Sequence, residues 1–402
     1  MKIFYTLLLV CANTCLVSAQ DQWTLYNTLN SPLPFDAVNA FAIDSSDAVW
    51  IGTGYGLARR EDNGTWTTYN LSNSGLPGID VRSLAVAADG SLWVGTFQSG
   101  VAHYDGTTWT TYTQTNSGLA SNFIKAITID TAGKVWFTSS RGLSQFDGTT
   151  WTTYYQVDYP VLRSDNFTSL AFEGNVLWLG TINGGLVKFT NGVFQIYYIG
   201  NSQIIDNTIL GVSVDDLGNK WLAHPYGGIS VFQSDGSWTR ITTSNSPGII
   251  SNSYWTIHAI NNTEIYGGSQ DEGFIANLGS GWRTYTTSNS AIPENAVQAL
   301  LLDNHGKVWC GTPNHGVAIF DKNGTPNSVE TLSPSNTLNL YPNPASSTLT
   351  LNVPNETPVQ VVDLLGKVWI NTPYQQSLDI SNLPVGMYLL KTATQSQTFM
   401  KR

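Results

Sequence analysis

The stretch Asp105–Tyr112 reads DGTTWTTY, and the same eight residues return as Asp147–Tyr154. Looser copies are NGTWTTY at residues 63–69 and GWRTY at residues 281–285. The aromatic residue of this motif belongs to a column whose members are 42 to 44 residues apart. The column consists of Trp23, Trp66, Trp109, Trp151, Phe194, Trp238 and Trp282. A fixed period of this length indicates an array of one supersecondary unit.

A second aromatic column marks another strand of the same unit, as in VWIGT (residues 49–53) and VWCGT (residues 308–312). Its seven members are Trp50, Trp93, Trp136, Trp178, Trp221, Tyr266 and Trp309. Each repeat contains four stretches of alternating polarity, joined in pairs by tight Asp/Gly turns. A longer loop, such as residues 114–122, leads to the next repeat. Four antiparallel strands in 40 to 45 residues are typical of one β-propeller blade.

The two ends of the array complement each other. The last repeat should carry its fourth-strand aromatic near position 325, where the sequence has Thr325 and Pro326 instead. Proline is excluded from central strands because it cannot donate to a ladder. QWTLY at residues 22–26 is a fourth strand without the first three. We therefore predict an all-β fold, a seven-bladed β-propeller closed by the N-terminal strand; the alternative, a solenoid, needs polar caps.

The composition agrees with short strands and excludes some partners. Only 11% of the 402 residues are charged and 12% are aromatic, with a formal net charge of −10. Binding of phosphate backbones or anionic lipid needs a basic face, which a chain with this charge and no Lys/Arg cluster does not offer. We expect no nucleic acid partner.

The N-terminus has the pattern of an export signal. Lys2 precedes an apolar run from Ile3 to Val17, and VSA precedes Gln20 as a small-residue cleavage site. We predict a signal peptide at residues 1–19 and no transmembrane segment. Cys11 and Cys15 fall inside it and lie in no lipoprotein box, so that Cys310 is the one cysteine of the mature chain. Cys310 follows Trp309 in a strand and is expected to be a small buried hydrophobe.

The repeat resembles the two-component-regulator propeller repeat, of pattern V..L..D..G.LW.GT..GG. The resemblance covers about residues 21–325 and implies a propeller at residues 20–325. In the sensors of this family the propeller precedes a transmembrane helix and a kinase, whereas this chain continues into a different tail. We expect a free-standing relative.

After a Pro/Ser/Asn-rich linker at residues 326–337, the composition changes. Residues 338–353, 359–370 and 378–392 read as strands of a small β-sandwich at residues 338–402. The motifs YPNP, DLLGK and LPVGMYLLK resemble the C-terminal sorting domain of the type IX secretion system. This resemblance implies that residues 338–402 engage the type IX machinery. It implies a secreted or cell-surface, outer-membrane-associated protein of a Gram-negative bacterium, often with tail removal and attachment to lipopolysaccharide.

The candidate site lies on the face where the longer loops of all blades emerge, which is the default recognition surface of such a fold. The predicted ligand-binding residues come from the loop between the second and third strands of each blade. They are Tyr55, Gln98, Arg141, Asn183, His224, Tyr226, Asp271, Glu272, Asn314 and His315. Aromatic residues in or near these loops suit stacking on sugars. These residues are Tyr55, Phe97, Tyr159, Tyr226 and Trp255.

A sharper hypothesis joins His224, Tyr226, Asp271, Glu272 and His315 into one site for a metal, a polar ligand or acid–base chemistry. The alternative is that they are ordinary polar loop residues. We predict no catalytic residue, no resident metal and no cofactor. The leading function is binding of an extracellular glycan or protein. A propeller lyase acting on a polysaccharide or a streptogramin is one alternative, and a structural or adhesive surface protein is another.

Overall fold

The computed structural model describes residues 22–324, 339–352, 359–363, 367–373, 375, 377–391 and 396–402. The chain divides into two compact units, Met1–Asn327 and Ser328–Arg402. All regular elements assigned within the described ranges are β-strands, which confirms the predicted all-β class. Within the same ranges, no helix is long and apolar enough to cross a membrane. The predicted signal peptide and linker lie outside the described residues.

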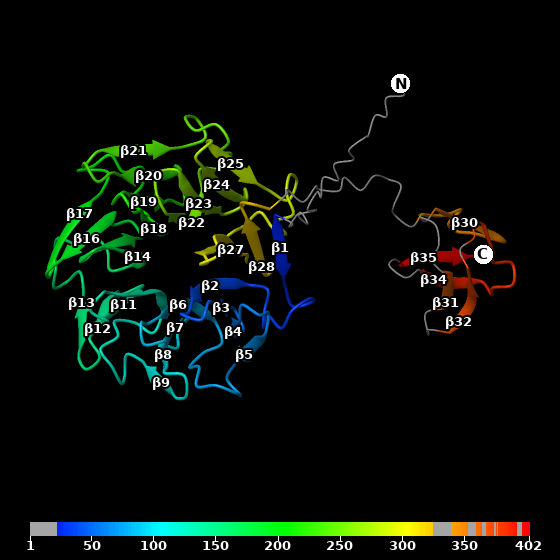
Figure 1. Ribbon diagram of the computed structural model, residues 1–402, viewed down its shortest axis with the longest axis horizontal. Helices are drawn as coiled ribbons and strands as arrows, with labels where there is room; N and C mark the ends of the chain where they lie inside the picture. The colour runs from blue at the N-terminus through cyan, green and yellow to red at the C-terminus, as the bar shows by residue number, and fades with distance from the viewer. Residues whose placement is uncertain are drawn as a thin grey trace, which may run out of the picture. The chain divides into compact units, whose positions relative to one another are not determined.

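Seven four-stranded antiparallel sheets make up residues 22–324 of the first unit (Figure 1). The first two are β2 (Val38–Ile43), β3 (Val49–Thr53), β4 (Gly56–Arg60), β5 (Trp66–Tyr69), and β6 (Val81–Val86), β7 (Leu92–Thr96), β8 (Val101–Tyr104), β9 (Trp109–Tyr112). The third and fourth are β10 (Ile124–Ile129), β11 (Val135–Ser139), β12 (Gly142–Phe146), β13 (Trp151–Tyr154), and β14 (Phe167–Glu173), β15 (Val176–Thr181), β16 (Leu186–Thr190), β17 (Val193–Tyr197). The fifth and sixth are β18 (Gly211–Val214), β19 (Lys220–Ala223), β20 (Ile229–Phe232), β21 (Trp238–Ile241), and β22 (Tyr254–Ala259), β23 (Glu264–Ser269), β24 (Phe274–Leu278), β25 (Trp282–Tyr285).

The sheets are arranged as propeller blades. Outer strands such as β9, β17 and β21 lie on the rim in Figure 1, and first strands such as β6, β18 and β22 lie toward the centre. Second strands such as β3, β7 and β11 are buried along their whole length because both of their faces are covered by neighbouring sheets. Trp136 of the third sheet, for example, lies 5.5 Å from Phe189 of the fourth between ring centroids. The second aromatic column therefore packs sheet against sheet.

The seventh sheet combines the two ends of the propeller. Its strands are β26 (Ala299–Leu302), β27 (Lys307–Gly311), β28 (Val317–Asp321) and the N-terminal β1 (Trp23–Tyr26). Trp23 pairs with Phe320, and its ring also contacts Phe274 of the sixth sheet at 5.8 Å. The sheets themselves are open, and none within residues 22–324 closes into a barrel. That the ring depends on β1 for its closure stays a prediction.

A glycine at the start of each third strand lets the fourth strand approach closely. Gly316 has φ +81°, and a Cβ there would lie 2.1 Å from the backbone oxygen of Tyr26 in β1. The equivalent glycines of the other sheets also have positive φ, a region that side-chain-bearing residues rarely adopt. They are Gly56, Gly100, Gly142, Gly185, Gly228 and Gly273. The repeated glycine is therefore a backbone requirement of the blade.

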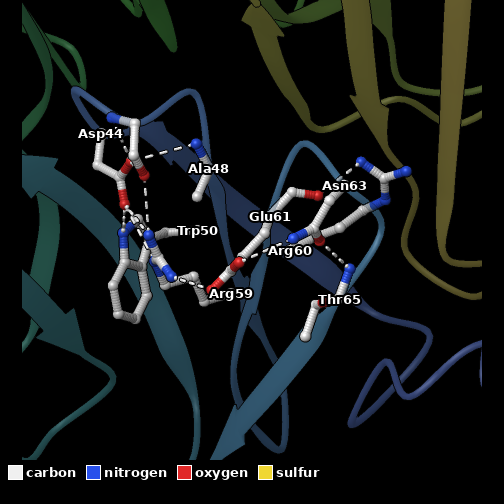
Figure 2. A network of polar contacts seen from close by, with 9 residues as sticks. Asp44, Ala48, Trp50, Arg59, Arg60, Glu61, Asn63 and Thr65 are labelled. Carbon is white, nitrogen blue, oxygen red and sulfur yellow. Dashed lines mark hydrogen bonds and ion pairs between the residues drawn. The ribbon is translucent and has the colours of Figure 1, made fainter.

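An aspartate fixes the turn between the first two strands and holds the buried tryptophan. In the first sheet, Asp44 Oδ1 accepts from the backbone N–H of Ser46 and Ala48, and Asp44 Oδ2 accepts from Trp50 Nε1 at 3.1 Å (Figure 2). Figure 2 also shows Arg59, which bonds the same carboxylate oxygen. Asp130, Asp215 and Asp303 hold Trp136, Trp221 and Trp309 in the same way. We call this arrangement the Asp–Trp clamp.

The second unit is a small β-sandwich of two sheets. One contains β29 (Asn339–Tyr341), β30 (Thr348–Asn352) and β33 (Ser377–Asp379); the other contains β31 (Val359–Asp363), β32 (Val368–Thr372), β34 (Gly386–Lys391) and β35 (Ser396–Lys401). Leu349 and Leu378 of the first sheet share one buried core with Val361, Leu390 and Phe399 of the second.

Candidate ligand-binding face

The longer loops of all seven sheets emerge on one side of the propeller, which we call the loop face. These are the loops between the second and third strands and the loops that connect one sheet to the next. Most exposed large hydrophobic side chains of residues 22–324 lie in these loops, namely Leu29, Phe35, Tyr55, Leu71, Phe97, Val157, Val161, Ile199, Tyr226 and Ile250. The others, Val193, Leu217 and Leu278, lie at turns of the opposite side. The loop face is thus the more apolar of the two exposed surfaces.

Most of the predicted site residues are exposed on this face. Tyr55 and Tyr226 have 57% and 74% of their surface exposed, respectively. Gln98, Arg141, Asn183, Asp271, Glu272, Asn314 and His315 are also exposed. Gln98 and Asn183 have positive φ angles, which place them at the tips of their turns. These residues are accessible to a ligand.

His224 differs, because its side chain is fully buried. Its Nδ1 donates to the backbone oxygen of Thr208 at 2.8 Å, and its Nε2 accepts from Ser230 Oγ at 2.9 Å. Ser230 Oγ in turn accepts from the backbone N–H of Ile205, which fixes the direction of the chain of bonds. Burial lowers the pKa of His224 to about 4, so the ring is neutral at pH 7. Both ring nitrogens are occupied inside the protein, and this side chain offers nothing to a ligand on the surface.

Asn314 and His315 of the loop face share a partner outside the predicted site. His315 Nδ1 lies 3.1 Å from an oxygen of Glu294, a residue absent from the predicted site, and Asn314 Nδ2 donates to the other oxygen of Glu294 at 2.7 Å. No hydrogen bond or ion pair joins any two of His224, Asp271, Glu272 and His315, all of which the structure describes. Within the described residues there is also no cluster of three or more His, Cys, Asp or Glu side chains that could hold a metal ion.

A second set of residues, absent from the sequence prediction, lies on the inner wall of the ring. In five sheets the first strand contains a register shift, and the residue at the shift is Asn39, Arg82, Lys125, Thr168 or Trp255. Leu210 and Gln298 occupy the equivalent positions in the fifth and seventh sheets. The residue just before each of these positions is fully buried, whereas each of the seven is at least partly exposed. We call these seven residues the inner-wall positions.

Three of the inner-wall positions connect their sheet to the next one. Gln298 Nε2 donates to the backbone oxygen of Val38 at 2.9 Å. Asn39 Nδ2 donates to the backbone oxygen of Val81, also at 2.9 Å. Thr168 Oγ1 donates to the backbone oxygen of Ile209 at 2.5 Å. A neutral donor at this position therefore has a structural function, since it pairs a buried carbonyl of the neighbouring sheet.

Arg82 and Lys125 do not pair a backbone carbonyl of the neighbouring sheet. Arg82 Nη2 instead pairs with Asp80 of its own sheet at 2.7 Å, and Lys125 Nζ donates to the side-chain oxygen of Asn166. Burial lowers the pKa of the Lys125 ammonium. Both side chains line a pocket of about 240 Å³, together with Asn39, Phe123 and Gln298. We call it the axial pocket, because its walls come from the first, second, third and seventh sheets.

A larger groove lies further out on the same face, over the first two sheets. Its volume is about 480 Å³, and Tyr55, Leu71, Pro32 and Pro34 are among its lining residues. The ring of Phe35 lies beside that of Tyr55, at 6.3 Å between centroids. The exposed side chains of Tyr55 and Leu71 thus border a groove instead of standing as isolated side chains.

Each of the two units contains a segment that matches a protein-family model. Residues 339–402 match the model described as secretion system C-terminal sorting domain. Residues 75–98 match the model described as two component regulator propeller. The comparison with curated protein sequences found no match.

Solved structures with this fold come from surface and extracellular proteins and from lyases. PorZ, a bacterial surface component of the type IX secretion system of Porphyromonas gingivalis, is 17% identical at a TM-score of 0.59, over 94% of this chain and 60% of its own. The extracellular domain of the hybrid two component system BT3049 from B. thetaiotaomicron is 20% identical at a TM-score of 0.63, over 95% and 57%. Virginiamycin B lyase from Staphylococcus aureus is 15% identical at a TM-score of 0.59, over 74% and 98%.

These likenesses establish the fold, and the chain spans about 60% of the length of the first two structures. The family matches add the type of repeat and the type of tail. The chain thus has a propeller in which one segment matches the two component regulator propeller model, and a tail that matches the secretion system C-terminal sorting domain.

Proposed function

We propose that this protein is a secreted or cell-surface binding protein, and that the centre of its loop face captures an extracellular glycan. The observation that carries the proposal is that most exposed large hydrophobic side chains of residues 22–324 lie on this face, where Tyr55 and Leu71 line the outer groove and Phe123 lines the axial pocket. Contiguous apolar surface on a soluble domain marks an interaction site. Aromatic rings beside amide side chains suit a sugar, which presents an apolar ring face and hydroxyl groups.

The tail supports the extracellular location. Residues 339–402 match a secretion system sorting domain, and we propose that they direct the propeller through the type IX system after cleavage of a signal peptide near Gln20. The test is expression in a host with this system, with and without residues 338–402. The intact chain should reach the cell surface or the medium, and the truncated chain should accumulate in the periplasm. Equal export of both would contradict the proposal.

The binding function can be tested with a glycan array. The probe protein is the chain without residues 1–19, and the loop-face variant Tyr55→Ala/Phe97→Ala is compared with the opposite-face variant Val193→Ala/Leu217→Ala. All four side chains are exposed, so neither variant should lose its fold. We expect glycan binding that the loop-face variant loses and the opposite-face variant keeps. Binding that only the opposite-face variant loses would place the site elsewhere, and an array without any signal would refute glycan binding.

A further inference from the structure

The axial pocket carries a positive charge that the protein itself does not neutralise. Arg82 pairs with Asp80 at 2.7 Å, so these two charges balance. Lys125 has no Asp or Glu oxygen within 4.0 Å among the described residues, and its hydrogen-bond acceptor is the neutral amide of Asn166. The pocket therefore holds two cations and one anion, in a chain whose formal net charge is −10.

The orientation of Arg82 and of the two amide side chains is fixed before any ligand arrives. Asp80 uses one oxygen to bond Arg82 and the other to accept from Asn39 Nδ2 at 3.2 Å. Asn39 Oδ1 in turn accepts from Gln298 Nε2 at 3.0 Å. This network crosses the second, first and seventh sheets. A preorganised donor set loses less entropy on binding than a flexible one.

Aromatic rings stand next to both cations. Phe97 and Phe123 meet edge to face, with their centroids 4.5 Å apart. The guanidinium carbon of Arg82 lies 5.3 Å from the centroid of Phe97, and Lys125 Nζ lies 5.8 Å from that of Phe123. A ligand near the ammonium group of Lys125 is therefore also near an apolar ring surface and near the amides of Asn39 and Gln298.

We infer that the axial pocket binds a sugar residue that carries a carboxylate, such as a uronic acid unit of an acidic polysaccharide. The inference rests on the proposed glycan-binding function and names its ligand class. One carboxylate matches the single unbalanced charge of the pocket, whereas a phosphate dianion would exceed it beside Asp80. A volume of about 240 Å³ fits one small ring and not a length of folded chain. The amide N–H groups of Asn39 and Gln298 are used within the protein, and their side-chain oxygens can accept from the sugar hydroxyl groups.

The experiment measures binding of three probes to the chain without residues 1–19. The probes are tri-galacturonate, the neutral cellotriose, and a tripeptide with a free carboxylate. The variants are Lys125→Gln, which removes the unbalanced charge, and Lys125→Arg, which keeps it. The control is Arg163→Gln, which removes an exposed cation of the loop between the third and fourth sheets, on the same face. Thermal unfolding of each variant verifies that it is folded.

We expect tri-galacturonate to bind the parent chain and Arg163→Gln equally. Lys125→Gln should weaken this binding about tenfold and reduce its dependence on salt, and Lys125→Arg should restore most of it. Equal affinity of Lys125→Gln and the parent chain for tri-galacturonate would overturn the inference, as would binding of the tripeptide but not of tri-galacturonate. Binding of cellotriose that depends on Tyr55 and Phe97 but not on Lys125 would overturn the inference and leave the proposed function intact. Absence of binding to every glycan would refute both the proposed function and the inference about the axial pocket.

Discussion

Gln298 Nε2 donates a hydrogen bond of 2.9 Å to the backbone oxygen of Val38, although 260 positions separate the two residues. The bond joins the inner strand of the seventh sheet to that of the first. A second bond reinforces it, because the backbone N–H of Val38 donates to the oxygen of Thr312 at 2.9 Å. The first and last repeats are thus hydrogen-bonded neighbours at the inner wall, as consecutive repeats are.

Removing the N-terminal strand should destabilise the whole propeller. Deletion of residues 21–27 exposes the edge of β28 and removes Trp23, which is 3% exposed. Loss of a buried tryptophan costs about 3–5 kcal/mol, and the lost strand pairing adds to this. We expect a large drop of the urea midpoint for the shortened chain that begins at Thr28. An unchanged midpoint would show that the ring does not depend on β1.

A point substitution tests the same strand without shortening the chain. In Gly316→Ala the new methyl group would lie 2.1 Å from the oxygen of Tyr26, so β1 must move away. Gly306→Ala is the matched control, because Gly306 also has positive φ (+77°) but has no atom within 4 Å of the added carbon. Both variants carry the backbone cost of about 1 kcal/mol. Only Gly316→Ala should lose clearly more in free energy of unfolding, and equal losses would argue against close approach of β1.

The Asp–Trp clamp should contribute more to the free energy of unfolding than an aspartate that only caps a turn. Asp303 accepts from the backbone N–H of His305 and Lys307 and from Trp309 Nε1 at 2.8 Å. In Asp303→Ala the buried indole N–H loses its partner, which together with the lost caps costs about 2–4 kcal/mol. Asp105→Ala removes an exposed cap that binds only Thr107 and Thr108, and should cost less. Comparable denaturation midpoints for the two variants would count against the indole bond.

Burial of His224 makes stability fall in mild acid. Its pKa is about 4 in the folded protein and about 6.5 in the unfolded chain, so the unfolded chain binds the extra proton between these values. The free energy of unfolding therefore decreases as the pH falls from 6.5 to 4, by about 3 kcal/mol from this residue. Above pH 6.5 the residue adds no pH dependence.

The matched variants are His224→Ala, which removes this titration, and His305→Ala, which removes an exposed histidine. Urea unfolding at pH 7.5 and at pH 4.5 gives the loss of stability for each protein. The loss should be smaller in His224→Ala than in the parent chain, and unchanged in His305→Ala. A parent-like loss in His224→Ala would mean that His224 is protonated in the folded state.

The propeller was predictable from sequence because six of its seven sheets are each built from one continuous repeat. The two aromatic columns located the strands, and the missing copy after Phe320 located the partner of β28 at the other end of the chain. The burial of His224, one of the predicted site residues, also had a signal in the sequence. His224 comes directly after Ala223, the last residue of β19, at the position where the other sheets have Thr53, Thr96, Ser139, Thr181, Ser269 and Thr312, all buried. Its neighbours in space, Thr208 and Ser230, could not be deduced from that position.

The axial pocket could not be predicted in the same way. A residue at a register shift is unpaired in its ladder, so alternation along the strand no longer tells which way its side chain points. The inner-wall positions recur at a regular spacing in the sequence. Their side chains differ in charge and polarity from Asn39 to Gln298, and this difference was the sign that the column is not part of the core. Some of these side chains bond a carbonyl of the neighbouring sheet, and others remain available to a ligand. The distances between the sheets decide which, and the sequence does not give those distances.

A ring of near-identical sheets offers a molecule at its centre several almost equivalent orientations. In this protein the two charged inner-wall positions, Arg82 and Lys125, belong to consecutive sheets, and the five others are neutral. One sector of the inner wall thus differs in charge from the rest. The pseudo-rotational symmetry of the propeller is therefore broken at the axial pocket. An anion bound at the centre would therefore have a single preferred orientation, although seven similar sheets surround it.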